Sequence, residues 1–480
     1  MADNELTLIN PPALIERPPI QQSGTLFIPE GMLITAMNPG LLSLATYLSE
    51  KGFAVNILDL SLEKDYDSLT KRVSGLSSEL VGISSTSGFD YIESLRIASM
   101  VKNSNPDCKI IFGGQHAGPL GKIVLEDNED VDAVVKYEGE TTLEQILTSR
   151  RKGNSQIFSL PGVVFRNGKN IEEVPGRPVI ISLNDLPALK YEMYPNYQKF
   201  TPFIEESRGC VFRCRYCTSN TVNGSKINIK NPKKFLAEVE RCVELFGTDK
   251  SYAVLASTYG VNPTFGKEIA VGMKRFGIKW NSEFRADSPW EHYINELLDS
   301  GYEVVNVGVE SGSPEILRLM GKTNYPEKYL NKMRKLAEVV DSSDAIIRAN
   351  FIFYIGETPK TLRETMSFIL STKCIDSVQF SPLLVFHGTP LFDSMPEYRE
   401  KFGSEIVSSE YWHRRHLYPA HPSKYFSFYE MVELGHMLEK IFSAESAWYE
   451  AAKSLYTQES KEAVKEIRDS LTNARFRRAQ

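Results

Sequence analysis

Short apolar runs alternate with amphipathic segments over most of the 480-residue chain, and this alternation constrains the fold more than any other feature. In the first third of the chain, strands are expected near residues 5–10, 53–59, 80–87, 109–114 and 131–136. Helices are expected at residues 41–49 and 92–103, and from Thr141 onward. Strands and helices at this spacing favour a mostly parallel sheet covered on both faces. We therefore predict an α/β, doubly wound, Rossmann-like domain over residues 1–155.

A second alternation runs over residues 201–395. Six strands are expected, near residues 203–207, 252–258, 279–285, 303–310, 345–353 and 377–381. The helices expected between them cover residues 234–246, 263–276, 289–300, 314–320, 326–339 and 359–372. Six βα units in succession predict a partial (β/α)6 barrel that is open on one side to admit substrate. The functional loops of such barrels follow the carboxyl ends of the strands.

The two remaining segments are predicted to be a connector and a cap. Within residues 156–200, Asn167-Gly168 between apolar runs predicts a β-hairpin, and the proline-rich stretch after it predicts a linker. Residues 396–480 are expected to form a small α-helical C-terminal domain, with helices at residues 427–443 and 445–458 and a charged final helix. This domain would cover the open side of the barrel.

Composition excludes several classes of partner. The net charge of −6 gives no electrostatic footprint for nucleic acid or for an anionic membrane. No apolar run approaches the roughly 18 residues of a membrane span. The first five residues lack the basic flank and the apolar core of a signal peptide. Six cysteines, three of them grouped, argue against a secreted disulfide framework, so we expect a cytoplasmic protein.

Three of the cysteines, Cys210, Cys214 and Cys217, have the spacing C-x3-C-x2-C directly after the first strand of the second region. Thiolates are the ligands that iron–sulfur clusters and zinc prefer. A structural zinc site needs a fourth ligand, and the next cysteine and histidine are Cys242 and His292. Three ligands without a fourth indicate a [4Fe–4S] cluster with one iron open to another molecule. A chance grouping, or a redox or zinc role, is the alternative.

This spacing, with the aromatic Tyr216 before the last cysteine, resembles the radical S-adenosylmethionine (SAM) superfamily. In that family SAM chelates the open iron. The reduced cluster then splits SAM into methionine and a 5′-deoxyadenosyl radical, and this radical abstracts hydrogen from an unactivated carbon. Gly308-Val-Glu310-Ser311 matches the family's fourth-strand motif. The resemblance implies a SAM site of Tyr216, Ser257, Glu283, Arg285, Gly308, Glu310 and Ser311. A surface carboxylate is the alternative for Glu310, and a structural ion pair for Glu283 and Arg285.

The first domain resembles the cobalamin-binding domain attached to many radical SAM enzymes. The resemblance rests on residues 113–116, Gly-Gly-Gln-His, and residues 137–140, Tyr-Glu-Gly-Glu, which follow expected strands. It implies a cobalamin site of Asn10, Pro11, Ser84, Ser85, Thr86, Gly113, Gly114, Gln115, His116, Glu138 and Gly139. The sequence lacks the D-x-H-x-x-G string of domains that bind cobalt through histidine, so we expect cobalamin without a protein imidazole. A domain that keeps the fold and has lost the cofactor is the alternative.

Together these resemblances imply an enzyme that transfers a methyl group from methylcobalamin to a small natural product. An electron donor such as flavodoxin or ferredoxin is implied as a partner. Radical dehydration, epimerisation or cyclisation without methyl transfer is the alternative reaction, and a non-catalytic corrinoid- or cluster-binding protein is the alternative class. Tyr259 and Asn262 lie in a loop that departs from the family pattern, and His413 and His416 lie in a histidine-rich segment. These four residues are candidate substrate contacts, although the histidine-rich segment could instead belong to a plain cap.

Overall fold

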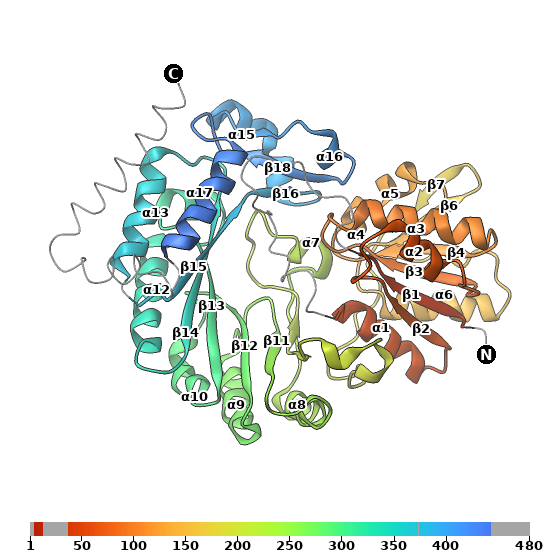
Figure 1. The fold of residues 1–480 in the computed structure, drawn as a ribbon, viewed down its shortest axis with the longest axis horizontal. Coiled ribbons are helices and arrows are strands. Elements are labelled where there is room, and N and C mark those ends of the chain that lie inside the picture. Colours follow the sequence, from red (N-terminus) through yellow and green to blue (C-terminus); the bar gives the residue numbers. More distant parts are fainter. Residues whose placement is uncertain (1–3, 13–36, 373, 443–480) are drawn as a thin grey trace.

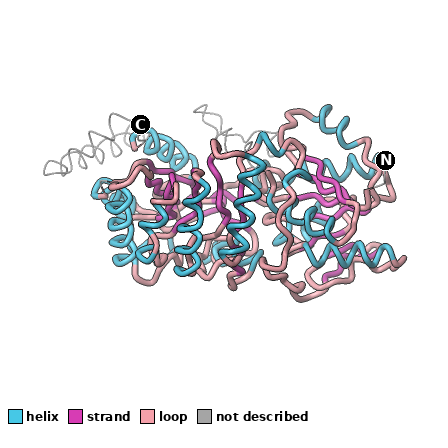
Figure 2. The backbone as a smooth tube through the Cα atoms, turned by 90° about the horizontal axis from the view of Figure 1, so that it is seen from below, coloured by secondary structure: helices cyan, strands magenta, loops and turns pink. Residues whose placement is uncertain are grey.

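The computed structural model describes residues 4–12, 37–372 and 374–442. The chain forms two α/β units side by side, and a smaller group of helices and strands lies above the second unit (Figure 1). Seen from below, the strands of the two units form separate groups, each with helices beside it (Figure 2). Within the described residues, no helix has the length and apolar character needed to cross a membrane.

The first unit contains a seven-stranded sheet with the order β2-β1-β3-β4-β5-β6-β7. Its parallel strands are β1 Leu6–Asn10, β2 Val55–Asp59, β3 Leu80–Ser84, β4 Lys109–Gly113 and β5 Ala133–Val135. Its helices are α1 Pro39–Glu50, α2 Tyr66–Val73, α3 Tyr91–Ser104, α4 Ala117–Leu120, α5 Lys122–Asp127 and α6 Glu140–Arg151. Buried residues of α1 and α6 belong to one core cluster and those of α2 to α5 to another. The expected doubly wound domain is therefore confirmed.

The hairpin expected in the connector extends this sheet. Strands β6 Val163–Asn167 and β7 Asn170–Glu173 pair with each other, and β6 pairs antiparallel with β5. Gly168 has φ 59°, the left-handed conformation that a tight hairpin turn requires. The sheet of the first unit thus continues past residue 155. Two 3-10 turns, η2 Tyr191–Met193 and η3 Tyr197–Lys199, then lead to the second unit.

The second unit contains six parallel strands in the order β15-β14-β13-β12-β11-β8. They are β8 Phe203–Glu205, β11 Ser251–Leu255, β12 Lys279–Phe284, β13 Tyr302–Glu310, β14 Ile346–Phe353 and β15 Ser377–Pro382. The helices are α7 Ser219–Asn223, α8 Pro232–Phe246, α9 Pro263–Met273, α10 Ile294–Leu298, α11 Pro314–Leu319, α12 Pro326–Val340 and α13 Pro359–Ser371, with 3-10 turns η4 Lys274–Phe276 and η5 Trp290–His292. Because β8 and β15 stand at the two edges of this sheet, the expected partial barrel is confirmed.

Helix α8 shows why these segments fold as they do. Its N-cap, Asn231, accepts a hydrogen bond from the Lys234 amide at 2.9 Å, and a proline follows at the first helical position. Its buried side chains recur at helical spacing and include Phe235, Val239, Cys242 and Phe246. The helix ends at Gly247, whose φ of 79° favours glycine. Local sequence therefore sets both ends of the helix and the face that it buries.

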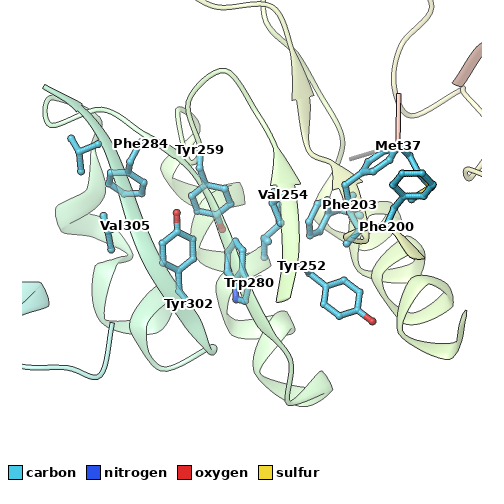
Figure 3. Close-up of a cluster of buried hydrophobic side chains, with 14 of the residues drawn as sticks. Met37, Phe200, Phe203, Tyr252, Val254, Tyr259, Trp280, Phe284, Tyr302 and Val305 are labelled. Carbon is cyan, nitrogen blue, oxygen red and sulfur yellow. The ribbon is translucent and has the colours of Figure 1, made fainter. Parts of the chain in front are cut away.

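The core of the barrel is rich in aromatic rings (Figure 3). Tyr259 is fully buried there, with its ring edge-on to Trp280 at a centroid distance of 5.4 Å. Its hydroxyl donates to the Gly266 carbonyl oxygen at 2.8 Å, and its amide donates to the Glu283 carbonyl oxygen at 2.8 Å. These bonds fold the loop after β11 back into the core. Tyr259 is therefore a core residue and not the substrate contact that we expected.

The segment after the barrel contains a small sheet as well as the expected helices. Its antiparallel strands have the order β16-β18-β17 and are β16 Leu384–Phe386, β17 Glu405–Ile406 and β18 Leu417–His421. The helices are α14 Pro390–Asp393, α15 Met395–Phe402, α16 Glu410–His413 and α17 Phe428–Ile441. Helix α17 lies against β15, since a Cβ at Gly435 would stand 3.2 Å from the Phe380 Cβ. The helices expected from residue 445 onward lie outside the described residues.

Candidate functional site

The cysteine loop follows β8 and the two-residue strand β9 Ser207–Arg208, which pairs with β10 Asn228–Ile229. Gly209 turns the chain with φ 82°, and a Cβ there would collide with the carbonyl oxygen of Lys226. Cys210, Cys214 and Cys217 are partly buried free thiols. Among the described residues, no three His, Cys, Asp or Glu side chains are grouped as a metal ion requires. In a four-iron cubane each thiolate binds a different iron, so the sulfurs stand further apart than around a single ion.

The surroundings of the three thiols are cationic. Burial raises the pKa of the Cys210 and Cys217 thiols, while Lys322 acts to lower the pKa of both and Arg285 acts to lower that of Cys210. Arg285 places Nη1 3.4 Å from the Cys214 sulfur. Metal binding requires thiolates, and nearby cations favour their formation. Three thiols facing two fixed cations fit a cluster that the chain holds through cysteine.

Arg285 is held firmly in this position. It donates to Asp287 at 2.8 and 3.0 Å and to the Lys322 carbonyl oxygen at 2.7 Å, and its guanidinium lies 3.7 Å from the centre of the Phe212 ring. The side chain therefore meets the cysteine loop from the carboxyl end of β12. The structure brings the predicted Arg285 to the Cys214 sulfur. Arg285 also forms a structural ion pair, the alternative considered for it, and its partner is Asp287.

The end of β13 carries a glutamate whose backbone conformation is strained. Glu310 has φ 72°, where the pairing with β14 shifts register, and such conformations in a residue other than glycine cost about 1–3 kcal/mol. Its Oε1 lies 2.8 Å from Lys322 Nζ, and both side chains are buried. Burial acts to lower the pKa of Lys322, but Glu310 holds it above its ordinary value, so the lysine stays charged. A Cβ at Gly308 would stand 2.5 Å from Glu310 Oε1, so the glycine makes room for this pair.

A cavity of about 760 Å³ lies between the two units. From the first unit it is lined by residues at the carboxyl ends of β1, β3, β4 and β5. From the barrel it is lined by residues within β8, β11 and β12 and by residues that follow β8 and β11. The predicted residues that line it are Asn10, Pro11, Ser84, Thr86, Gly113, Gly114, Gln115, Glu138, Gly139, Ser257 and Glu283. Both kinds of sheet bind ligands at the carboxyl ends of their strands. The two units thus present their functional edges to one space.

Part of this cavity runs along an apolar face of the first sheet, with a lining that includes Leu8, Met37, Leu41, Ile111 and Leu143. Two glycines keep that part open. A Cβ at Gly82 would stand 2.8 Å from a methyl carbon of Leu8. A Cβ at Gly113 would meet only the Val135 carbonyl oxygen, at 3.8 Å, and would otherwise project into the cavity. The backbone is therefore open to a large apolar or planar ligand.

Arg208 joins the two units at the edge of the cavity. Its guanidinium contacts Glu205 at 2.8 Å within the barrel, and Glu138 and Glu140 of the first unit at 3.0 and 2.8 Å. Burial raises the pKa of Glu138, and Arg208 acts against that rise. The arginine stands two residues before Cys210, so the cysteine loop and the loop after β5 are fixed to each other. No sequence motif indicates Arg208, because Glu138 and Glu140 are distant from it along the chain.

Glu283 links the cavity to the Glu310–Lys322 pair. Its carboxylate lines the cavity and accepts a hydrogen bond from Asn306 at 3.2 Å. Burial and then the nearby Glu310 raise the pKa of Glu283. The predicted SAM residues Glu283 and Glu310 are therefore neighbours, and Lys322, which no sequence motif indicated, is close to both the carboxylates and the thiols.

Three of the predicted ligand residues make hydrogen bonds within the fold. The Ser85 hydroxyl donates to Asp90 at 2.7 Å, and Ser311 is buried with its hydroxyl 3.1 Å from that of Thr365. The Asn262 side chain caps α9 by accepting from the Phe265 amide at 3.2 Å. Polar residues at strand and helix ends often bond to local backbone in this way. Tyr216 packs edge-on against Tyr354 at 5.9 Å, beside the cysteines and outside the cavity lining.

The three predicted histidines also lie outside the cavity lining. His116 is buried beneath the cap and donates from Nε2 to the Arg415 carbonyl oxygen at 2.8 Å. His416 has φ 49° and contacts Asp127 at 2.7 Å, and His413 is exposed at the end of α16. His116 and His416 thus fasten the cap to the first unit, and His116 is not placed to reach a ligand in the cavity.

Burial lowers the pKa of His116 to about 4, which predicts a pH-dependent stability. Below its unfolded pKa of about 6.5, the unfolded chain binds a proton that the folded chain excludes, so stability falls as pH falls from 6.5 toward 4. One pH unit corresponds to about 1.4 kcal/mol. The variant His116→Gln is expected to flatten this slope in urea unfolding measured between pH 7 and pH 5, whereas His413→Gln keeps it. Equal slopes for wild type and His116→Gln would contradict the assignment.

Two family models match the chain. Residues 35–147 match the B12 binding domain, and residues 204–369 match the radical SAM superfamily. An uncharacterized methyltransferase of Pyrococcus horikoshii is 25% identical, covering 74% of this chain and 77% of the relative. The bacteriochlorophyllide d C-12(1)-methyltransferase of Chlorobaculum tepidum is also 25% identical, covering 80% and 78%. The anaerobic magnesium-protoporphyrin IX monomethyl ester cyclase of Rubrivivax gelatinosus is 24% identical, covering 67% and 60%.

Among solved structures, the radical SAM methyltransferase TsrM of Kitasatospora setae, with tryptophan and a SAM analogue bound, superposes with a TM-score of 0.68. The two chains are 15% identical, and the match covers 97% of this chain and 99% of TsrM. The chain therefore combines a B12 binding domain with a radical SAM domain. Its whole described fold is that of TsrM, and the family resemblances seen in the sequence are confirmed.

Proposed function

We propose that this protein is a cobalamin-dependent radical SAM methyltransferase that acts on a small molecule. The observation that carries this proposal is the shared cavity, into which the B12-binding domain and the radical SAM barrel both direct the carboxyl ends of their strands. When bound, the reduced [4Fe–4S] cluster supplies the electron that splits SAM into methionine and a 5′-deoxyadenosyl radical, and methylcobalamin supplies the methyl group.

The residues of the chain would bind and orient the cluster and SAM. Cys210, Cys214 and Cys217 would hold the cluster, and Arg285 would stabilise the Cys214 thiolate by a charge-assisted hydrogen bond. We assign to SAM the carboxylates of Glu310, which is paired with Lys322, and of Glu283, which lines the cavity. Ser257 lies in the cavity lining between the two units, where SAM and the substrate would meet.

The cavity lining supports cobalamin as the second cofactor. Small residues at Ser84, Gly113 and Gly114 let a planar macrocycle approach the backbone, and Glu138 and Gln115 can accept hydrogen bonds from its amide side chains. No histidine occurs among the described residues that line the cavity. One relative named as a bacteriochlorophyllide methyltransferase and one structural neighbour that binds tryptophan support a small-molecule substrate.

Two further assignments belong to this proposal. A one-electron carrier protein must reduce the cluster, because none of the described lining residues is a redox donor of sufficient strength. We place the enzyme in a reducing cytoplasm, where its six free cysteines would persist. The cyclase among the relatives supports radical cyclisation as a second candidate reaction.

The test is a product assay on anaerobically purified, reconstituted enzyme with candidate substrates. Methyl transfer is expected to give S-adenosylhomocysteine together with 5′-deoxyadenosine. The variant with all three cysteines changed to alanine is expected to give neither product, because the cluster has lost its ligands. 5′-Deoxyadenosine alone, with no bound corrinoid, would favour cyclisation, dehydration or epimerisation. An intact cluster that fails to cleave SAM would contradict the whole proposal.

A further inference from the structure

The tip of the cysteine loop forms an exposed surface that the proposed chemistry leaves without a role. We call it the cluster-loop face and define it by Val211, Arg213, Lys226, Gly321 and Tyr325. Val211 is 44% exposed and Tyr325 is 72% exposed, although both are large hydrophobic side chains. Arg213 and Lys226 are exposed as well. Exposed apolar side chains with charged neighbours are typical of protein-binding surfaces.

Three segments of the chain meet at this face. The Lys226 carbonyl oxygen lies directly against Gly209, next to the first cysteine. A Cβ at Gly321 would stand 3.3 Å from the Arg213 carbonyl oxygen, and Tyr325 follows four residues later in the same connection between α11 and α12. The cysteine loop therefore lies against both the loop before β10 and the turn at Gly321, from which the chain runs to Tyr325 and the start of α12.

The charge of this part of the chain is unusual. Residues 207–237 contain seven lysines and arginines and no aspartate or glutamate, in a protein whose 61 acidic residues outnumber its 55 lysines and arginines. Arg208 and Lys230 are taken up by ion pairs in the interior, whereas Arg213, Lys226 and Lys233 are exposed. A locally cationic surface on an acidic protein attracts an acidic partner.

The face gives a short covalent route to the cysteines. Val211 is bonded to Cys210, and Arg213 is bonded to Cys214, so a molecule touching these side chains is one residue from two cluster ligands. Val211, Arg213 and Lys226 do not line the cavity between the units. An electron can therefore reach the cysteines from this side while the cavity is filled by cofactor and substrate.

We propose that the cluster-loop face docks an acidic one-electron carrier protein of the flavodoxin or ferredoxin type. The inference rests on the proposed function. One electron leaves the reduced carrier, which is thereby oxidised by one electron, and enters the cluster held by the three cysteines. Val211 and Tyr325 provide the apolar centre of the contact, and Arg213 and Lys226 orient the acidic carrier around it.

The test compares Arg213→Glu/Lys226→Glu with Lys64→Glu/Lys169→Glu. Both double variants change the net charge equally, and the second pair of lysines is exposed in the first unit. Two quantities are measured: the Kd of purified flavodoxin for each protein by biolayer interferometry, and SAM cleavage driven either by reduced flavodoxin or by dithionite. The first variant is expected to weaken binding by about 10-fold or more and to slow flavodoxin-driven cleavage, with dithionite-driven cleavage unchanged. The control variant is expected to match wild type in every assay.

Further measurements also test the docking site. Binding of wild type should weaken as ionic strength rises, because exposed charges are screened over about 8 Å at physiological salt. Val211→Ser, which keeps every charge, should also weaken flavodoxin binding. Unchanged binding in Arg213→Glu/Lys226→Glu would overturn the docking site, as would a wild type that accepts electrons from dithionite and from neither flavodoxin nor ferredoxin. If dithionite fails to drive cleavage, the proposed function falls, and the binding data alone decide the docking site.

Discussion

Glu310→Gln is expected to destabilise the enzyme by about 3 kcal/mol and to reduce SAM cleavage by about 100-fold or more. The substitution leaves the Lys322 ammonium, whose side chain is 4% exposed, without a counter-charge in the interior. Removing one partner of a buried ion pair is costly because the remaining charge stays desolvated. The carboxylate that we assign to SAM is lost at the same time. Urea unfolding and 5′-deoxyadenosine formation measure the two effects.

A second variant separates stability from chemistry. Glu310→Gln/Lys322→Met removes both charges and is expected to regain most of the lost stability without regaining SAM cleavage. The exposed pair of Arg318 and Glu327, at 2.9 Å, supplies the control. Glu327→Gln should leave both unfolding and SAM cleavage close to wild type, because solvent screens an exposed pair. Wild-type stability and activity in Glu310→Gln would show that the pair is not needed for either.

Gly113→Leu is expected to weaken cobalamin binding by about 10–100-fold while dithionite-driven SAM cleavage is retained. A side chain at this position would occupy the cavity, and overpacking costs about 1–3 kcal/mol, which is about one to two powers of ten in affinity. The corrinoid bound per chain after reconstitution, read by absorbance, measures the effect. The product should shift from S-adenosylhomocysteine with 5′-deoxyadenosine to 5′-deoxyadenosine alone.

Gly75→Leu is the matched control, because a Cβ at Gly75 meets no atom within 4 Å and the residue lies outside the cavity lining. It should bind cobalamin as wild type does. If Gly113→Leu also retains full corrinoid content, the macrocycle does not approach β4, and the assignment of the cavity to cobalamin is wrong.

The parts of this protein that sequence predicts well are those set by local pattern. Alternating strands and helices are encoded within each segment, so both α/β units were expected. Gly113 and Glu138 were expected in the site because they follow strands, and parallel strands direct their carboxyl ends to one edge. The cysteine spacing that predicts a cluster lies within eight residues. Each of these inferences needs only neighbours along the chain.

The parts that sequence misses depend on contacts between distant segments. Lys322 and Arg208 gain their roles from Glu310 and from Glu138 and Glu140, which are brought near by tertiary packing. Tyr259 has a polar hydroxyl in a loop of unusual sequence, and only the fold shows that the hydroxyl is satisfied within the core. The hairpin after residue 162 was recognised, but its place in the first sheet depends on pairing with β5.

The ion pairs of Arg208 have a consequence for how the enzyme is assembled. The same guanidinium is bound to the loop after β5, which lines the cobalamin cavity, and stands two residues from the first cysteine. Any ligand that moves one of these loops also displaces the other, because the Arg208 side chain connects them. Thermodynamic reciprocity then requires that, if corrinoid loading changes the affinity for iron, iron loading changes the affinity for corrinoid by an equal factor. The order in which the two cofactors are inserted would alter the path to the holoenzyme but not its final stability.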